Sequence, residues 1–192
     1  MHDVLQEAMY HFATQSGAAK ALTVFCASYL VWVMLLAWLG AAVASRDRFT
    51  LALVVRIVAM VALSFVVGLL LRHVVIDPRP YKVDGEVPLT TVSNDNGFPS
   101  DHTLMAAAMT ASLWWYNRKL LLPFAALLLF VMLGRMGIAA HHSIDVLGSV
   151  AIVAVVAAIL TFIPLPASWD RPLLASTGSQ SQAFPRSSAR MR

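Results

Sequence analysis

Long runs of apolar residues alternate with short polar segments along most of the chain. An α-helix needs about 20 mainly apolar residues to cross the hydrocarbon core of a bilayer, and several runs reach that length. The pattern predicts transmembrane helices over residues 21–44, 51–71, 101–116, 120–137 and 142–165. The expected fold class is therefore all-α: a polytopic membrane helix bundle with about five transmembrane helices.

A further helix is predicted ahead of the first span. Over residues 3–16 apolar side chains recur at helical spacing, while Asp3, Gln6 and Glu7 fall off that stripe. This pattern is typical of an interfacial helix that lies on the membrane surface. A cleaved signal peptide is the alternative, but the segment has no basic start and a full-length span follows it.

The helix over residues 101–116 is short for a transmembrane segment. At about 1.5 Å per residue it reaches only about 24 Å, less than the roughly 30 Å thickness of the hydrocarbon core. Its C-terminal end carries an interfacial aromatic belt, Trp114-Trp115-Tyr116. We therefore expect its start, at Asp101, to lie below the membrane surface.

The composition excludes an ordinary water-soluble domain, because 59% of the residues are hydrophobic and only 12% are charged. The single cysteine, Cys26, rules out an internal disulfide and a cysteine-rich metal site. Residues 1–166 are expected to form one membrane-embedded domain. The polar, arginine-containing segment 167–192 is predicted to be a disordered cytoplasmic tail.

The distribution of basic residues predicts the orientation in the membrane. Five spans place eight of the 14 Lys and Arg residues on one side and five on the other, with Arg56 left inside a span. Arg56 is expected to extend to the nearer surface. Because basic loops stay in the cytoplasm, the C-terminus is predicted to be cytoplasmic and the N-terminus external.

Three clusters of chemically active residues fall together on the predicted external side, at 72–81, 98–103 and 134–145. Ionisable residues at membrane depth are costly and usually functional, so this convergence marks a candidate site. The clusters contain three arginines, two histidines and a carboxylate: Arg72, Arg79, Arg135, His102, His141 and Asp145.

His141 and Asp145 are four residues apart and are expected on one face of a helix. The carboxylate can then accept the proton of one imidazole nitrogen and leave the other free as a nucleophile. A neutral pair that only stabilises the helix is the alternative. The neighbouring His142 should point about 100° away and serve as a helix-cap or loop residue.

The other two clusters offer groups that bind anions. Ser100 is placed to cap a helix whose free N–H groups form an anion site, although capping alone would also explain it. His102, in the first turn, should face such an anion. Pro78 and Pro80 hold Arg79 in an extended segment, and guanidinium groups match phosphate oxygens without a metal.

These blocks resemble the three-part signature of the type-2 phosphatidic acid phosphatase superfamily. They are Arg72 with Arg79-Pro80, Pro99-Ser100-Asp101-His102, and Arg135 with His141 and Asp145. Within that superfamily the chain is most similar to the bacterial undecaprenyl-diphosphate phosphatases. The resemblance implies hydrolysis of undecaprenyl diphosphate through a phosphohistidine, on the outer face of the bacterial plasma membrane, to recycle a lipid carrier for cell-wall synthesis.

The resemblance also implies the role of each residue. His141 is the nucleophile, Asp145 its partner and His102 the general acid. The phosphate ligands are Arg72, Arg79, Ser100 and Arg135. The enzyme needs no metal or other cofactor, and its partners are a polyprenyl diphosphate lipid and the bilayer, not nucleic acid.

Three residues depart from the pattern of the superfamily. Arg72 stands where Lys is usual, Asp101 replaces Gly, and Gly134 replaces Ser. Since Asp101 would repel phosphate if it pointed inward, we expect it to face away and to interact with the helix dipole instead.

Three alternatives remain. A divalent metal could be held by histidines drawn from His73, His102, His141 and His142 with nearby acids. The arginines could hold a lipid phosphate without chemistry, as in a binding or transport protein. The substrate could be phosphatidylglycerol phosphate, phosphatidic acid or a lipid A phosphate. The sequence does not predict an oligomeric state.

Overall fold

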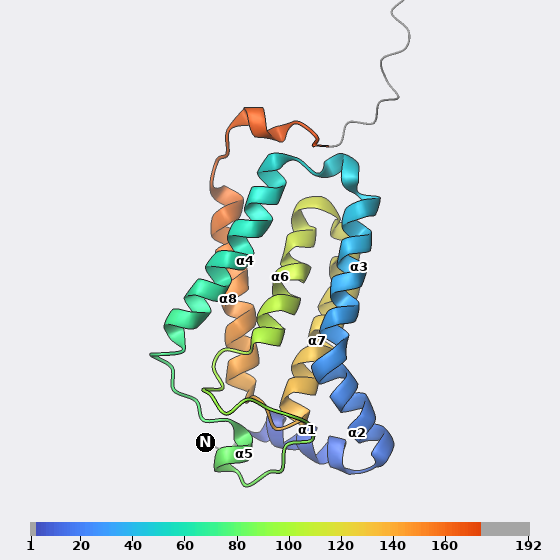
Figure 1. Cartoon of the computed structure of the whole chain (residues 1–192), viewed down its shortest axis with the longest axis vertical. Helices are drawn as coiled ribbons and strands as arrows, with labels where there is room; N and C mark the ends of the chain where they lie inside the picture. The colour runs from blue at the N-terminus through green and yellow to red at the C-terminus, as the bar shows by residue number, and fades with distance from the viewer. Residues whose placement is uncertain (1–2, 174–192) are drawn as a thin grey trace, which may run out of the picture.

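The computed structural model describes residues 3–173. In this range the chain folds into a bundle of long helices that run side by side along the long axis of the molecule (Figure 1). The described residues form no β-sheet, only an isolated bridge between Thr50 and Pro172. The predicted all-α membrane bundle is confirmed.

The described residues form eight α-helices, joined by loops and by short π- and 3-10-helical segments. In chain order the α-helices are α1 (Val4–Thr14), α2 (Gly17–Val24), α3 (Leu30–Ala44), α4 (Leu51–Leu71), α5 (Pro80–Val83), α6 (Asp101–Tyr116), α7 (Leu121–Gly137) and α8 (Ser143–Phe162). A π-helical segment, η1 (Phe25–Tyr29), joins α2 to α3. Short 3-10 turns are η2 (Arg46–Arg48), η3 (Arg118–Leu120) and η4 (Ala167–Asp170).

Within residues 3–173, four helical segments are long and apolar enough to cross a membrane: 17–44, 51–71, 118–137 and 143–162. The first begins four residues earlier than predicted, because α2, η1 and α3 are continuous. The remaining predicted span, α6, has the predicted bounds of 101–116 but, with 16 residues, is shorter than each of these four segments.

The short helix α6 lies at the centre of the bundle, in contact with α3, α4, α7 and α8 (Figure 1). Buried apolar side chains cover it from two sides: Met34 and Val131 lie in the cluster on one side, and Met60 and Val153 in the cluster on the other. A helix enclosed by protein can end inside the bundle, because other protein segments satisfy its terminal backbone groups.

The N-terminal helix α1 crosses the lower end of the bundle beneath α7 (Figure 1). Asp3 caps it by accepting a hydrogen bond from the backbone N–H of Gln6. Val4, Leu5 and Phe12 are exposed, so an apolar surface remains on this helix, as an interfacial position requires.

The segment expected to begin a disordered tail is folded at its start. Residues 167–170 form η4, and Leu173 donates a backbone hydrogen bond to Phe49. The rest of the predicted tail lies outside the described residues. Arg56 extends toward this end of the bundle, where it donates to the backbone oxygen of Ile163.

The departure at Gly134 has a packing explanation. Helix α7 crosses η1 so closely that a Cβ atom at Gly134 would lie 2.6 Å from the backbone nitrogen of Ala27. Because backbone atoms cannot move aside cheaply, the serine usual at this position would not fit here.

We therefore predict that Gly134→Ala destabilises the protein by about 1–3 kcal/mol, as is typical of overpacking. The measurement is the midpoint of thermal unfolding in detergent. Gly40→Ala is the matched control, since a Cβ at Gly40 meets nothing within 4 Å. Equal midpoints for the two variants would contradict the close packing of α7 against η1.

Candidate active site

The candidate site lies at the end of the bundle where α4 and α7 end and α6 and α8 begin (Figure 1). The three predicted clusters do converge there: Arg72 contacts Asp101, while Arg79 and Arg135 contact His141. The loop from 84 to 100 closes over the same end and supplies contacts that the sequence pattern did not predict.

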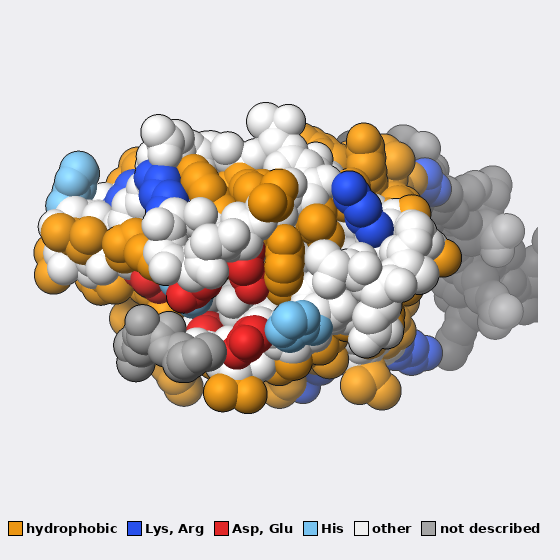
Figure 2. All heavy atoms as spheres, turned by 90° about the horizontal axis from the view of Figure 1, so that it is seen from below, with side chains coloured by type: hydrophobic (Ala, Val, Ile, Leu, Met, Phe, Trp, Pro, Cys, Tyr) orange, Lys and Arg blue, Asp and Glu red, His pale blue; other side chains and the backbone are white. Residues whose placement is uncertain are grey.

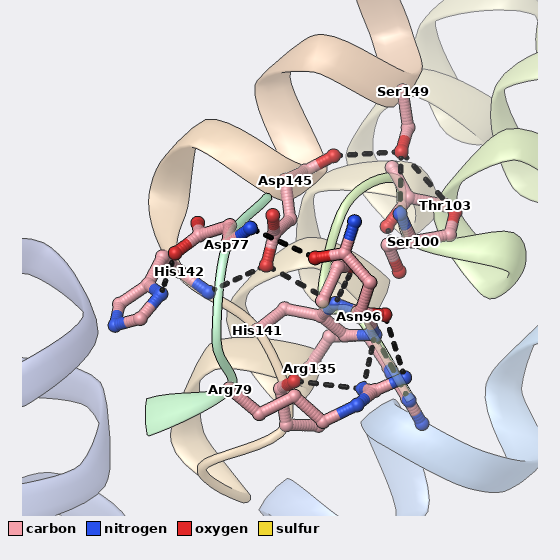
Figure 3. A network of polar contacts seen from close by, with 12 residues as sticks. Asp77, Arg79, Asn96, Ser100, Thr103, Arg135, His141, His142, Asp145 and Ser149 are labelled. Carbon is pink, nitrogen blue, oxygen red and sulfur yellow. Dashed lines mark hydrogen bonds and ion pairs between the residues drawn. The ribbon is translucent and has the colours of Figure 1, made fainter. Parts of the chain in front are cut away.

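His141 lies in the loop between α7 and α8, and its two ring nitrogens face opposite kinds of partner (Figure 3). Nδ1 lies 2.9 Å from the carbonyl oxygen of Gly97 and 3.3 Å from Oδ2 of Asp145. Nε2 lies 3.3 Å from Arg79 Nη1 and 3.2 Å from Arg135 Nη2.

These contacts assign the protonation state of His141. A carbonyl oxygen only accepts and a guanidinium only donates, so Nδ1 carries the proton and Nε2 presents a lone pair. Burial, together with the positive charges of Arg135 and Arg79, holds the pKa of His141 well below its usual value. The ring is therefore a neutral base whose free nitrogen points between two guanidinium groups.

Asp145, in the first turn of α8, is completely buried. Its Oδ2 accepts the backbone N–H of His142 at 3.0 Å in addition to facing His141. Oδ1 is buried without a hydrogen-bond partner among the described residues. The expected pairing is present, but not on one helix face, because α8 begins at Ser143 and His141 precedes it. His142 is the N-cap residue of α8, as expected.

Arg79 precedes the short helix α5 and is only 4% exposed. Besides His141 it contacts the backbone oxygen of Ala140 at 2.9 Å, Ser93 Oγ at 2.8 Å and the Asp95 carboxylate at 2.6 Å. Its Nε–H donates to the backbone oxygen of Asp95. These partners accept hydrogen bonds from the guanidinium group and fix its plane beside His141.

Asp95 lies between two of the predicted phosphate ligands. Its Oδ1 contacts Arg79, and its Oδ2 lies 3.6 Å from Nη1 of Arg72. Burial by itself would raise the pKa of Asp95, but hydrogen bonds from Arg79 and Ser93 hold it below its usual value. The carboxylate is therefore ionised and neutralises arginines that a bound phosphate would also require.

The departure at Asp101 differs from the prediction. The side chain is 60% exposed, yet its carboxylate does not face away from the arginines, because Oδ1 lies 3.2 Å from Nη2 of Arg72. Arg72 is the C-cap residue of α4. Its guanidinium group contacts two carboxylates, those of Asp95 and Asp101. The longer reach and forked head of Arg, compared with Lys, suit such a double contact.

Arg135, near the end of α7, donates to the backbone oxygen of Ala27 at 3.4 Å as well as facing His141. Its Nε is buried without a hydrogen-bond partner among the described residues. This arginine is therefore less completely occupied than Arg79.

Ser100 is buried at the N-cap position of α6, but its hydroxyl caps no backbone N–H of that helix, so the capping prediction is wrong. The hydroxyl accepts a hydrogen bond from Thr103, and the backbone N–H of Ser100 donates to Ser149 Oγ in α8. His102, in the first turn of α6, is half-buried and makes no side-chain hydrogen bond within the described part of the chain.

Two further residues of the loop hold the site together. Asn96 accepts the backbone N–H of Asp77 and donates to the backbone oxygens of Arg72 and Val75, which fixes the segment after α4. Gly97 offers its carbonyl oxygen to His141, and a Cβ there would lie 2.8 Å from Oδ2 of Asp145. The string Asn94-Asp95-Asn96-Gly97 is a turn signal that could have identified them.

The histidine set proposed as an alternative metal site does not assemble within residues 3–173, because His73 is exposed and lies in no group with His102, His141 or His142. A different group gathers instead. Asp77, His142 and Asp145 each place one potential ligand atom within 4.8 Å of the others. These are the described residues near His141 that could hold a metal.

A histidine, a carboxylate and several arginines at one end of a membrane bundle form an arrangement suited to binding and transferring a phosphate group. The model of the PAP2 superfamily matches residues 53–168, more than half of the chain, and the chain belongs to this superfamily. It is also similar to undecaprenyl-diphosphatase BcrC of Bacillus subtilis (strain 168), with 27% identity over 160 residues, 81% of this chain and 80% of that protein. No solved structure matches the chain.

We predict that Asp95→Asn strengthens inhibition by vanadate about tenfold, which corresponds to about 1.4 kcal/mol. The substitution keeps the shape of the side chain but removes the charge that competes with an oxyanion for Arg72 and Arg79. The measurement is the vanadate concentration that halves hydrolysis of a lipid phosphate.

The matched control is Asp101→Asn, which should change the vanadate concentration by less than about threefold, because this exposed carboxylate contacts Arg72 alone among the described arginines. Weaker vanadate inhibition of the Asp95 variant would mean that Asp95 builds the anion site and does not occupy it.

Proposed function

We propose that this protein hydrolyses undecaprenyl diphosphate to undecaprenyl phosphate and inorganic phosphate through a phosphohistidine at His141. The observation that carries the proposal is the unprotonated Nε2 of His141, which points between the guanidinium groups of Arg79 and Arg135. A nucleophile beside two phosphate-binding groups is the arrangement that phosphoryl transfer requires. The similarity to an undecaprenyl-diphosphatase supports this choice of substrate.

In the first step the terminal phosphate replaces the Asp95 carboxylate and binds to Arg72, Arg79, Arg135 and Ser100. Nε2 of His141 attacks the phosphorus while the bond to the leaving lipid phosphate breaks. The arginines offset charge that spreads over the equatorial oxygens. The ring becomes a cation that keeps its Nδ1 proton, and Asp145 stabilises that cation.

His102 is the proposed general acid. It donates a proton to the leaving lipid phosphate and then accepts one from the water that attacks the phosphohistidine. Cleavage of the nitrogen–phosphorus bond returns the lone pair to Nε2 and releases inorganic phosphate. A side chain without hydrogen bonds to the described residues is free to turn toward the leaving group.

The proposed location is a bacterial plasma membrane, with the site on the external face and the C-terminus in the cytoplasm. Counted along the sequence, the segments on the C-terminal side of the predicted spans carry eight of the 14 basic residues, which supports this orientation. Dephosphorylation on that face would recycle the lipid carrier for cell-wall synthesis.

We predict that His141→Ala lowers kcat at least 1,000-fold, because removing a nucleophile abolishes the covalent route. The measurement is phosphate release by purified protein, with helical content in detergent as the test of folding. His73→Ala is the matched control and should retain wild-type turnover, since this histidine is exposed. Substantial activity of the His141 variant would refute the nucleophile.

We further predict that hydrolysis survives a chelator such as EDTA, because the proposed steps use no metal.

We also predict that kcat/KM is highest for undecaprenyl diphosphate when the purified protein is assayed with a panel of lipid phosphates. The panel includes phosphatidylglycerol phosphate, phosphatidic acid and a lipid A phosphate. A higher kcat/KM for one of these would reassign the substrate. Binding of all of them without phosphate release would favour a non-catalytic lipid-phosphate protein.

A further inference from the structure

The end of the bundle opposite the candidate active site carries a hollow that the proposed reaction does not use. Two connections meet there, η2 between α3 and α4 and η3 between α6 and α7, at the upper end in Figure 1. Arg48 fastens one connection to the other, because its Nη1 donates to the backbone oxygen of Tyr116 at 2.7 Å. The hollow between them, called the distal hollow below, has a volume of about 610 Å³ and is lined by residues that include Asp47, Arg48, Trp114, Trp115, Arg118 and Lys119.

The charged side chains of the distal hollow are mainly basic. Three cations line it, and Asp47 is the single carboxylate among the lining residues. Within residues 3–173 none of the three cations forms an ion pair with a carboxylate. The end that carries the candidate active site differs, because acidic side chains gather near the centre of its face (Figure 2). The distal hollow therefore offers positive charge that an anionic ligand can neutralise.

Arg118 is held in place by the aromatic residue beside it. Its guanidinium carbon lies 4.0 Å from the ring centre of Trp114, a cation–π contact, and its Nε donates to the backbone oxygen of the same residue at 3.1 Å. The two terminal nitrogens of Arg118 donate no hydrogen bond within the described part of the chain. A guanidinium fixed in this way keeps its forked donors for a ligand, and that fork matches the oxygens of a phosphate.

An apolar groove adjoins the distal hollow and shares Trp114 and Trp115 with it. The groove has a volume of about 290 Å³ and lies between α6, α8 and the first residue of α7. Small side chains leave room in it, those of Ala111, Ala157 and Ala158. Since α8 is one of the segments long and apolar enough to cross a membrane, the groove extends from the hollow along a surface suited to lipid.

The distal hollow lies where membrane-crossing segments end. The segments 17–44, 51–71 and 118–137 all end or begin at the two connections that form it. Tryptophan side chains are typical of this depth, at the boundary between hydrocarbon and water. A ligand at this position can place a charged head group in the hollow and an apolar chain in the groove.

We propose that the distal hollow and the adjoining groove bind one anionic phospholipid, with its phosphate held by Arg48, Arg118 and Lys119 and an acyl chain lying along α8. Charge complementarity selects an anionic head group, and the groove selects a lipid over a soluble phosphate. The end of the chain does not carry the complementary charge, because residues 174–192 contain three arginines and no acidic side chain. The inference is independent of the proposed function.

The first test measures lipid binding by native mass spectrometry of the full chain in detergent. Phosphatidylglycerol should bind more tightly than phosphatidylcholine with the same acyl chains, and Arg118→Gln should weaken binding of phosphatidylglycerol about tenfold, since a phosphate ligand is lost. The matched control is Arg46→Gln, because Arg46 lies in η2 without lining the hollow, and it should change the affinity by less than about threefold.

Two outcomes of this measurement would overturn the proposal. Equal losses in the Arg118 and Arg46 variants would mean a general attraction of lipid to basic residues. Equal affinity of the wild-type protein for phosphatidylglycerol and phosphatidylcholine would mean that the positive charge of the hollow selects no head group.

A second pair of variants tests the groove. Ala158→Leu fills it from α8, whereas Ala154→Leu adds the same side chain one turn earlier, outside the groove. Both alanines are exposed, so neither leucine overpacks the core. Ala158→Leu should weaken binding of phosphatidylglycerol severalfold, and Ala154→Leu should leave it unchanged. Equal affinity of the two variants would show that the acyl chain lies elsewhere and overturn the proposal.

The position of the lipid is read from phosphatidylglycerol that carries a photoreactive diazirine in its acyl chain. Cross-links are expected within residues 111–121 and 157–161, and Arg118→Gln should reduce them. Cross-links confined to the end that carries His141 would overturn the proposal. Glycerol phosphate, a head group without chains, should not displace the lipid at equal concentration, and displacement would identify a soluble phosphate as the ligand instead. None of these measurements follows hydrolysis, so an inactive protein would contradict the proposed function alone.

Discussion

The site depends on one constraint: a neutral imidazole has to remain beside two guanidinium groups inside an otherwise apolar bundle. Burial, together with the positive charges of Arg135 and Arg79, holds the pKa of His141 well below its usual value, and its free nitrogen then accepts hydrogen bonds from the two arginines. Gly97 and Asp145 hold the other nitrogen and prevent the ring from turning. Charge, tautomer and orientation are thus fixed by the same few contacts.

The bundle places these groups by bringing helix ends together. Because α6 is enclosed by the other helices, its first residues lie among the ends of α4 and α7 and the start of α8. The apolar helices therefore act as a frame, and the chemistry is confined to the segments that join them. Close contacts such as that of Gly134 with η1 fix the position of α7, which carries Arg135 at the next residue.

The sequence predicted the helices well, because the length and apolarity of each run carry that information directly. It also predicted that Arg79, Arg135, His141 and Asp145 meet, since topology alone brings their segments to one end. Contacts made by irregular backbone could not be read in this way. Asp95 and Gly97 act through a loop conformation that no periodicity encodes.

The errors have the same origin. The hydroxyl of Ser100 was expected to cap α6, but the residue is bound instead to Thr103 and to Ser149 of a distant helix. The composition after residue 166, rich in serine and arginine, resembles that of a disordered tail, yet Leu173 donates a backbone hydrogen bond to Phe49. Local sequence reports local preference, and each of these outcomes was decided by a tertiary partner.

The loop between α5 and α6 gives this architecture a point of vulnerability. Of three consecutive residues, Asp95 binds Arg72 and Arg79, Asn96 binds the segment that ends α4, and Gly97 binds His141. Asp95 is 46% exposed, so the loop is accessible from the polar end of the bundle. A compound that pulls this loop outward would disarm the enzyme by releasing all three contacts at once, without having to enter the lipid or imitate its substrate.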